Sequence, residues 1–206
     1  MNAKKLDITD CRVENDNSNS SVAKVYLPYL HDLVCLLTGV ILVFTLLFRV
    51  VVVSGPSMNN TLIDGDWLLL LGNVLYSEPK PGDVIVASKD SFDDGFPIIK
   101  RVIATEGDVV DIDFEAGVVF VNGVALDEPY TLTPTNQQEG IVFPITVEKN
   151  CIFVMGDNRN ISKDSRSTEI GQIDRREVLG RAVFLLYPGN NKGRVERNLS
   201  RIGAVG

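Results

Sequence analysis

The sequence predicts a mainly β protein, an antiparallel β-sheet or partial barrel preceded by one N-terminal transmembrane helix. Two observations support this prediction. The only long apolar run, residues 33–48, lies near the start of the chain, and no long amphipathic helical pattern follows residue 53. The later apolar stretches are short and are separated by glycine, aspartate and serine, which is typical of an antiparallel β domain.

Residues 1–29 are predicted to form a polar cytoplasmic tail. Within it, residues 15–21 are almost entirely asparagine and serine. Because such a segment has little apolar surface to bury, we expect a flexible chain from residue 1 to about residue 21.

Residues 30–53 are predicted to be a single transmembrane segment. The uncharged centre, 33–48, has 16 residues, and a helix needs roughly 17 to 25 to cross the bilayer core, so flanking residues must extend it. A cleaved signal peptide fits less well, because the run starts late and lacks an Ala-x-Ala-like end. A buried core helix fits less well, because the run has no polar face. We therefore predict a single-pass protein of the cell membrane. Basic residues such as Lys24 precede the segment, which predicts that the N-terminus is cytoplasmic and that the domain at 54–206 is extracytoplasmic.

Short strands are predicted along the rest of the chain, each an apolar stretch between turn residues. They are 67–71, 84–87, 118–121, 124–126, 141–147, 151–155 and 178–187. Between two of them, Asn122 and Gly123 suit a type I′ turn, which predicts a β-hairpin.

Composition excludes several classes of function. The net charge of −7 argues against nucleic acid as a partner. Cys11, Cys35 and Cys151 are odd in number and form no CxxC or Cys/His cluster, so we predict neither a structural disulfide nor a metal site.

The single histidine, His31, lies at the edge of the apolar run, far from every polar motif. A Ser-His-Asp triad therefore has no plausible histidine, and lysine is the known substitute base.

The segment Ser54-Gly55-Pro56-Ser57-Met58 follows the apolar run directly. Glycine permits and proline fixes a sharp backbone, so this turn can present the Ser57 hydroxyl together with its own amide N–H. Ser57 is the candidate nucleophile. The alternative is that it is only a turn residue.

Lys100 is the candidate base. On a strand its side chain would share a face with Ile98 and Val102, whereas Arg101 would point the other way. A desolvated lysine loses its proton more readily, as a general base requires. The alternative is a side chain that reaches out to water.

The run from Gly156 to Arg166 is rich in hydrogen-bonding groups and follows a predicted strand. Its Ser162 hydroxyl has the chemistry to orient a lysine base, and Asp164 can pair with Arg166 to hold the loop. A solvated loop with exposed charges is the simpler alternative.

These three segments, in this order, resemble three motif boxes of the type I signal peptidases. The intervening Gly65-Asp66 and 81–84 segments and the later 122–123 and 128–130 segments also fit, so the resemblance extends from the apolar run to about Tyr187. Lys100 distinguishes this chain from those relatives that have histidine at the same position.

The resemblance implies a membrane-anchored serine endopeptidase that removes signal peptides from exported preproteins after small residues. It implies Ser57 as nucleophile and Lys100 as general base, with the Ser57 N–H in the oxyanion hole. No cofactor is implied, and the partners are preproteins and membrane lipid. Supporting roles fall to Gly55, Gly156, Asp157, Ser162, Asp164 and Arg166, and the candidates for an apolar substrate pocket are Met58, Leu62 and Ile99.

The sequence departs from the family pattern at a few positions. Asn60 replaces a usual proline, residues 104–108 with Glu106 replace a usual Gly-x-Pro-Gly-Asp, and Gly55 stands where some members have serine. Two other functions stay open. One is a Ser-Lys self-cleaving regulator of related fold, which would be soluble and carry a DNA-binding segment. The other is an inactive membrane-anchored β scaffold for partner binding.

Overall fold

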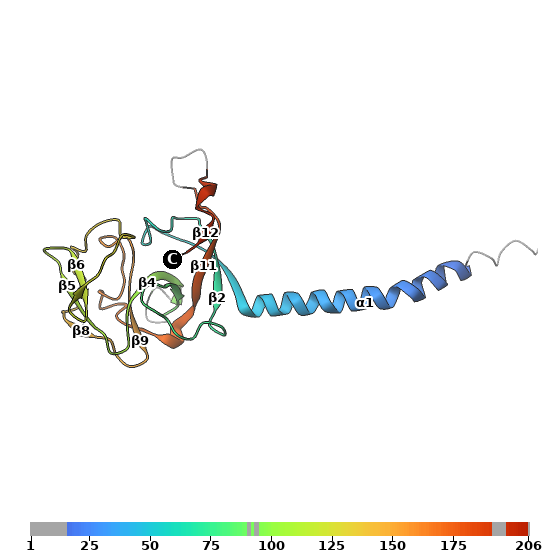
Figure 1. Ribbon diagram of the computed structural model, residues 1–206, viewed down its shortest axis with the longest axis horizontal. Helices are drawn as coiled ribbons and strands as arrows, with labels where there is room; N and C mark the ends of the chain where they lie inside the picture. The colour runs from blue at the N-terminus through green and yellow to red at the C-terminus, as the bar shows by residue number, and fades with distance from the viewer. Residues whose placement is uncertain (1–15, 90–91, 93–94, 191–196, 206) are drawn as a thin grey trace, which may run out of the picture. The chain divides into compact units, whose positions relative to one another are not determined.

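The computed structural model describes residues 16–89, 92, 95–190 and 197–205. The chain divides into two compact units, one up to Thr45 and one from Leu46 onward. The described part of the first unit is helical: it belongs to α1, Asp16–Leu47, which is drawn in blue in Figure 1 and ends two residues into the second unit. Its 22 residues Tyr26–Leu47 are long and apolar enough to cross a membrane by length and composition.

The polar residues before the apolar run are more ordered than we expected. Helix α1 already begins at Asp16, so residues 16–21 are helical rather than a flexible tail. Helix formation is cooperative, and a long apolar helix can therefore extend into neighbouring residues of modest propensity. The rest of the expected tail, residues 1–15, lies outside the described residues.

The predicted transmembrane segment is too long at its C-terminal end. The helix stops at Leu47, and strand β1, Phe48–Val52, pairs antiparallel with β2, Trp67–Gly72. Three consecutive valines favour this extended conformation because β-branched side chains fit strands better than helices. The β unit therefore includes residues 46–53, which the sequence analysis had assigned to the membrane segment.

The main sheet of this unit has eight strands, all paired antiparallel, and curls into a half-barrel, as the fold class predicted (Figure 1). Its order is β1-β2-β11-β3-β4-β9-β10, and β12 pairs with β11. The strands not yet given are β3 Val84–Ala87, β4 Ile98–Thr105, β9 Cys151–Met155, β10 Ile173–Asp174, β11 Val178–Tyr187 and β12 Gly203–Ala204, with the 3₁₀ turns η2 Arg175–Glu177 and η3 Leu199–Arg201.

A second sheet has the order β7-β6-β5-β8. Its strands are β5 Val109–Asp113, β6 Val118–Val121, β7 Val124–Ala125 and β8 Ile145–Thr146. The predicted hairpin is confirmed, because Asn122 and Gly123 have φ of 53° and 79° between the paired strands β6 and β7. The strand expected at 141–147 shrinks to β8, because Pro144 has no N–H for a ladder.

Strand β4 is the centre of the fold. It pairs with β3 on one side and β9 on the other, and residues 100–104 are all buried. Three apolar clusters cover the two faces of the strand. Ile99 packs against the first cluster, Val102 belongs to the second and Ile103 belongs to the third. A polar side chain in the middle of this strand is therefore held away from solvent.

Candidate active site

The turn that carries Ser57 lies between β1 and β2. Gly55 adopts φ of 89°, a conformation that other residues rarely tolerate, and its N–H donates to Asp64 Oδ1 at 2.9 Å. The next side chain, Met58, is buried in the core with Leu62. Ser57 is thus presented by a turn that is fixed at both ends.

The loop after β9 holds the same turn from a distance of about a hundred residues in sequence. The Asn158 N–H donates to the Ser57 carbonyl oxygen at 3.0 Å, and Asn158 Nδ2 donates to the Pro56 carbonyl oxygen at 3.1 Å. A Cβ at Gly156 would lie 2.5 Å from the Ser57 carbonyl oxygen and still closer to Ser162 Oγ. Only glycine therefore lets the two segments approach this closely.

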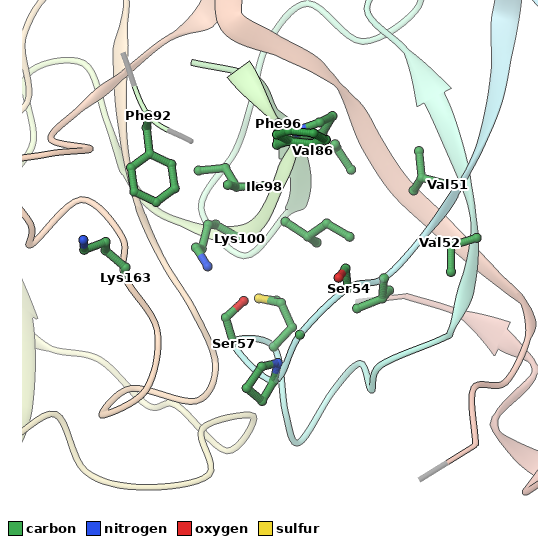
Figure 2. A pocket seen from close by; sticks show the side chains of 16 residues that line it. Val51, Val52, Ser54, Ser57, Val86, Phe92, Phe96, Ile98, Lys100 and Lys163 are labelled. Atoms are coloured by element: carbon green, nitrogen blue, oxygen red, sulfur yellow. The ribbon is translucent and has the colours of Figure 1, made fainter. Parts of the chain in front are cut away.

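Lys100 of β4 is 5% exposed and lines the same cavity as Ser57. Figure 2 shows the Lys100 amine and the Ser57 hydroxyl pointing toward one another. The cavity has a volume of about 360 Å³. Its other lining residues are Val51, Val52, Val53, Ser54, Gly55, Pro56, Met58, Val86, Phe92, Phe96, Pro97, Ile98, Ile99 and Lys163.

Burial lowers the pKa of Lys100 to about 8, because the charged form has lost most of its hydration. The negative charges of Asp164, Glu139 and Asp157 oppose this change, and the positive charge of Arg166 supports it. The amine is therefore close to half neutral at mildly alkaline pH, as a proton acceptor must be.

Asp164 and Arg166 form a buried ion pair within the loop. Arg166 Nε donates to Asp164 Oδ1 at 2.8 Å, and Asp164 Oδ2 accepts the Gly156 N–H at 2.9 Å. The Ser162 Oγ is buried and has no hydrogen-bond partner among the described residues. It is therefore available to a group that enters the site, although no bond to Lys100 is formed here.

Sequence reasoning missed a buried network beside the site. Arg101 makes a two-bond ion pair with Asp157 at 2.9 and 2.8 Å and stacks over the Tyr130 ring at 4.1 Å. Arg159 pairs in the same way with Glu128 at 2.8 and 2.6 Å. Asp157 thus holds Arg101 and, through it, strand β4. The available signal was the density of charged residues in the 156–166 segment.

Comparisons with known proteins identify the family of the chain. The family described as "Signal peptidase, peptidase S26" matches residues 27–187. The chain belongs to the signal peptidases. It is accordingly a serine endopeptidase of the class that cleaves signal peptides.

Individual relatives are signal peptidases as well. Signal peptidase I of Bacillus licheniformis is 33% identical over 158 residues, which cover 73% of this chain and 82% of that protein. A probable signal peptidase I-1 of Synechocystis sp. is 34% identical over 169 residues, covering 76% and 82%. A signal peptidase I structure from Enterococcus faecalis V583 is 27% identical, with a TM-score of 0.42, and covers 50% of this chain and 96% of that chain.

Two of the three expected pocket residues line the cavity of this signal peptidase. Met58 and Ile99 do so, but Leu62 is 1% exposed in the core and is not among the lining residues. The Leu62 N–H donates to the Met58 carbonyl oxygen at 2.9 Å, and this tight turn directs Leu62 inward. The missed lining residues include Val51 and Val52 of β1, a strand that the sequence analysis had placed in the membrane.

Of the departures from the family pattern, Asn60 and residues 104–108 lie outside the cavity lining. The Glu106 carboxylate accepts the Asn150 N–H at 2.9 Å, in an exposed turn between β4 and β5. Asn60 is exposed on the nucleophile turn. Gly55 does line the cavity, with no side chain to donate there.

Within the described residues, no group of three or more histidine, cysteine, aspartate or glutamate side chains has the arrangement of a metal site.

Proposed function

We propose that Ser57 and Lys100 form the catalytic dyad of a membrane-anchored signal peptidase that cleaves exported preproteins after small residues. One observation carries the proposal: a buried amine, with no hydrogen-bond or ion-pair partner among the described residues, faces a serine hydroxyl in one apolar cavity (Figure 2). The family assignment supports the substrate class, and the alternatives of a self-cleaving regulator or an inactive scaffold gain no support from it.

In the acylation step, Ser57 Oγ attacks the carbonyl carbon of the scissile peptide bond while the neutral Lys100 amine accepts the hydroxyl proton. The resulting ammonium gives this proton to the leaving nitrogen as the C–N bond breaks. Water then attacks the ester carbonyl, with Lys100 again accepting a proton, and Ser57 is regenerated. Because the pKa of Lys100 is about 8, roughly a tenth of the amine is neutral at pH 7.

The oxyanion of the tetrahedral intermediate needs hydrogen-bond donors. The Ser57 N–H donates no hydrogen bond to any described residue, and the Gly55–Ser57 turn is fixed by Asp64 and Asn158. A free N–H on a rigid turn is a suitable oxyanion donor, because it needs no reorganisation during the reaction. In this proposal Ser162 contacts the Lys100 amine when substrate enters.

The preference for small residues follows from the walls of the cavity. The cavity that holds Ser57 is lined by branched or bulky apolar groups, among them Val51, Val86, Ile99 and Met58. A wall of this kind leaves room for alanine-sized side chains and offers no partner to a polar one. This matches the Ala-x-Ala-like ends of signal peptides.

Helix α1 would anchor the enzyme, with the N-terminus in the cytoplasm, because Lys24 and earlier basic residues precede its apolar span, Tyr26–Leu47. Ser57 is ten residues from the end of this helix. An extended chain of that length spans at most about 35 Å, which limits how far the nucleophile can lie from the end of the anchor.

The test is cleavage of a preprotein by the purified full-length chain in detergent. Ser57→Ala and Lys100→Met should each abolish cleavage while circular dichroism stays unchanged. Ser77→Ala and Lys149→Met are matched controls, because both residues are exposed and lie outside the cavity lining. Cleavage that survives either dyad substitution in a folded protein contradicts the dyad. An inactive wild-type chain would favour the scaffold alternative.

A further inference from the structure

The cavity has an unusual charge for this protein. The chain carries a net charge of −7, yet the only ionisable side chains among the described residues that line the cavity are Lys100 and Lys163. Both are basic, and the pKa of Lys100 is low enough to leave it partly neutral. Lys163 is therefore the basic side chain of the cavity lining that the proposed reaction does not use.

The Lys163 backbone is held firmly although its side chain is accessible. Its neighbours Ser162 and Asp164 are 1% and 0% exposed, whereas the Lys163 side chain is 47% exposed. Lys163 Nζ lies 2.6 Å from Glu169 Oε2 and 5.7 Å from the centre of the Phe92 ring. In Figure 2 it lies across Ser57 from Val51 and Val52. A substrate strand that reaches Ser57 therefore has the apolar side chains of Val51 and Val52 on one side and the Lys163 side chain on the other.

We infer that Lys163 is a specificity-determining residue that favours substrates with an acidic side chain within two residues of the scissile bond. The inference rests on the proposed function and adds a charge preference to the preference for small residues. An ammonium has three donors, and Glu169 takes only one of them. Glu169 is itself 61% exposed and is not among the cavity-lining residues, so its ion pair with Lys163 is weak and open to a second carboxylate.

The experiment compares preproteins that carry aspartate or asparagine at the second position before the cut or at either of the two positions after it, with alanine kept directly before the cut. The measured quantity is the ratio of kcat/KM for the aspartate substrate to that for the asparagine substrate. We expect a ratio of about 2 to 5 at one position for the wild-type enzyme, in the range of an exposed ion pair. Added salt, at about 0.5 M, should reduce this ratio because the charges are accessible to solvent.

Three variants make the inference falsifiable. Lys163→Met should bring the ratio to about 1, and Glu169→Gln should raise it because the competing carboxylate is gone. Lys149→Met removes an exposed lysine outside the cavity lining and should keep the wild-type ratio. A wild-type ratio of 1 at every position, or a ratio that survives Lys163→Met, overturns the inference. Because both substrates must be cleaved for a ratio to exist, loss of all cleavage contradicts the dyad instead.

Discussion

At the scale of single residues, the four buried basic side chains among the described residues of the β unit differ in whether they have a carboxylate partner. Arg101, Arg159 and Arg166 are each 2% exposed or less, and each forms an ion pair at 2.6–2.8 Å. Lys100 is also buried but appears in none of the ion pairs of the described residues. A buried charge without a partner is costly, so this amine readily loses its proton.

The first prediction concerns the pH dependence of cleavage. Only neutral Lys100 accepts the Ser57 proton, so kcat/KM should rise with pH through an apparent pKa of about 8 and level off above it. The measurement is kcat/KM from pH 6 to 10 with a substrate that carries no titrating group near the cut. A flat profile across this range would rule out Lys100 as the base.

Glu139→Gln is the informative control for that profile. The Glu139 carboxylate lies 3.5 Å from Arg166. Its negative charge opposes the lowering of the Lys100 pKa, and only the charge of Asp164 does so more strongly. Its removal should lower the Lys100 pKa further and move the rising limb to lower pH. A limb that moves to higher pH contradicts the electrostatic account.

The second prediction concerns the stability of Lys100→Met. The folded-state pKa of about 8 lies below the ordinary value of 10.5, so the folded state disfavours the charged lysine, which costs about 3 kcal/mol below pH 8. The unfolded chain binds the additional proton between pH 8 and 10.5, so wild-type stability rises through that range. Lys100→Met should therefore be more stable by about 1–3 kcal/mol at pH 7, and the difference should shrink toward pH 10.5. Urea unfolding at both pH values measures it, and a less stable variant at pH 7 would contradict it.

At the scale of elements, the site depends on the contact between the β1–β2 turn and the loop after β9. Two hydrogen bonds from Asn158 and the missing side chain of Gly156 make this contact. The buried ion pair of Asp164 with Arg166 fixes the conformation of the loop itself. The nucleophile is thus positioned by an element that is remote in sequence.

The third prediction tests this contact. Gly156→Ala places a Cβ against the Ser57 carbonyl oxygen and Ser162 Oγ, so the turn and the loop must separate. A displacement of about 1 Å costs on the order of a hundredfold in rate, and we expect a loss of that size in kcat. Gly203→Ala, where a Cβ meets nothing within 4 Å, is the matched control. If both variants keep wild-type kcat, the close approach is not required.

At the scale of the whole molecule, the helix and the sheet meet within a continuous stretch of chain. Strand β1 begins at Phe48, directly after α1 ends at Leu47. Its five residues pair with β2, and Val53 after it is 3% exposed in the core. The enzyme unit therefore includes residues that look like part of a membrane segment.

The fourth prediction follows from this boundary. A fragment that begins at Leu46 should fold as a monodisperse β protein, whereas one that begins at Ser54 should be less stable and aggregate. The shorter fragment loses Val53 from the core, worth about 1.5–3 kcal/mol, and exposes the edge of β2. Urea midpoints and gel filtration measure the difference. Equal stability of the two fragments would contradict the role of β1.

The sequence alone was sufficient for the local and periodic features. Strands β3, β6, β9 and β11 have the predicted bounds, and the type I′ turn forms at Asn122-Gly123, because these depend on neighbouring residues. The family was also recognisable from short segments in a fixed order.

Only the tertiary structure decided which residues meet. It showed that Lys100 is buried, because three clusters from distant strands cover β4, and that Leu62 turns into the core instead of the cavity. It assigned residues 48–52 to a strand. Their apolar composition is like that of the helix before them, and only the pairing with β2 distinguishes the two. Burial and strand pairing depend on contacts between segments far apart in the chain, and no local pattern encodes those contacts.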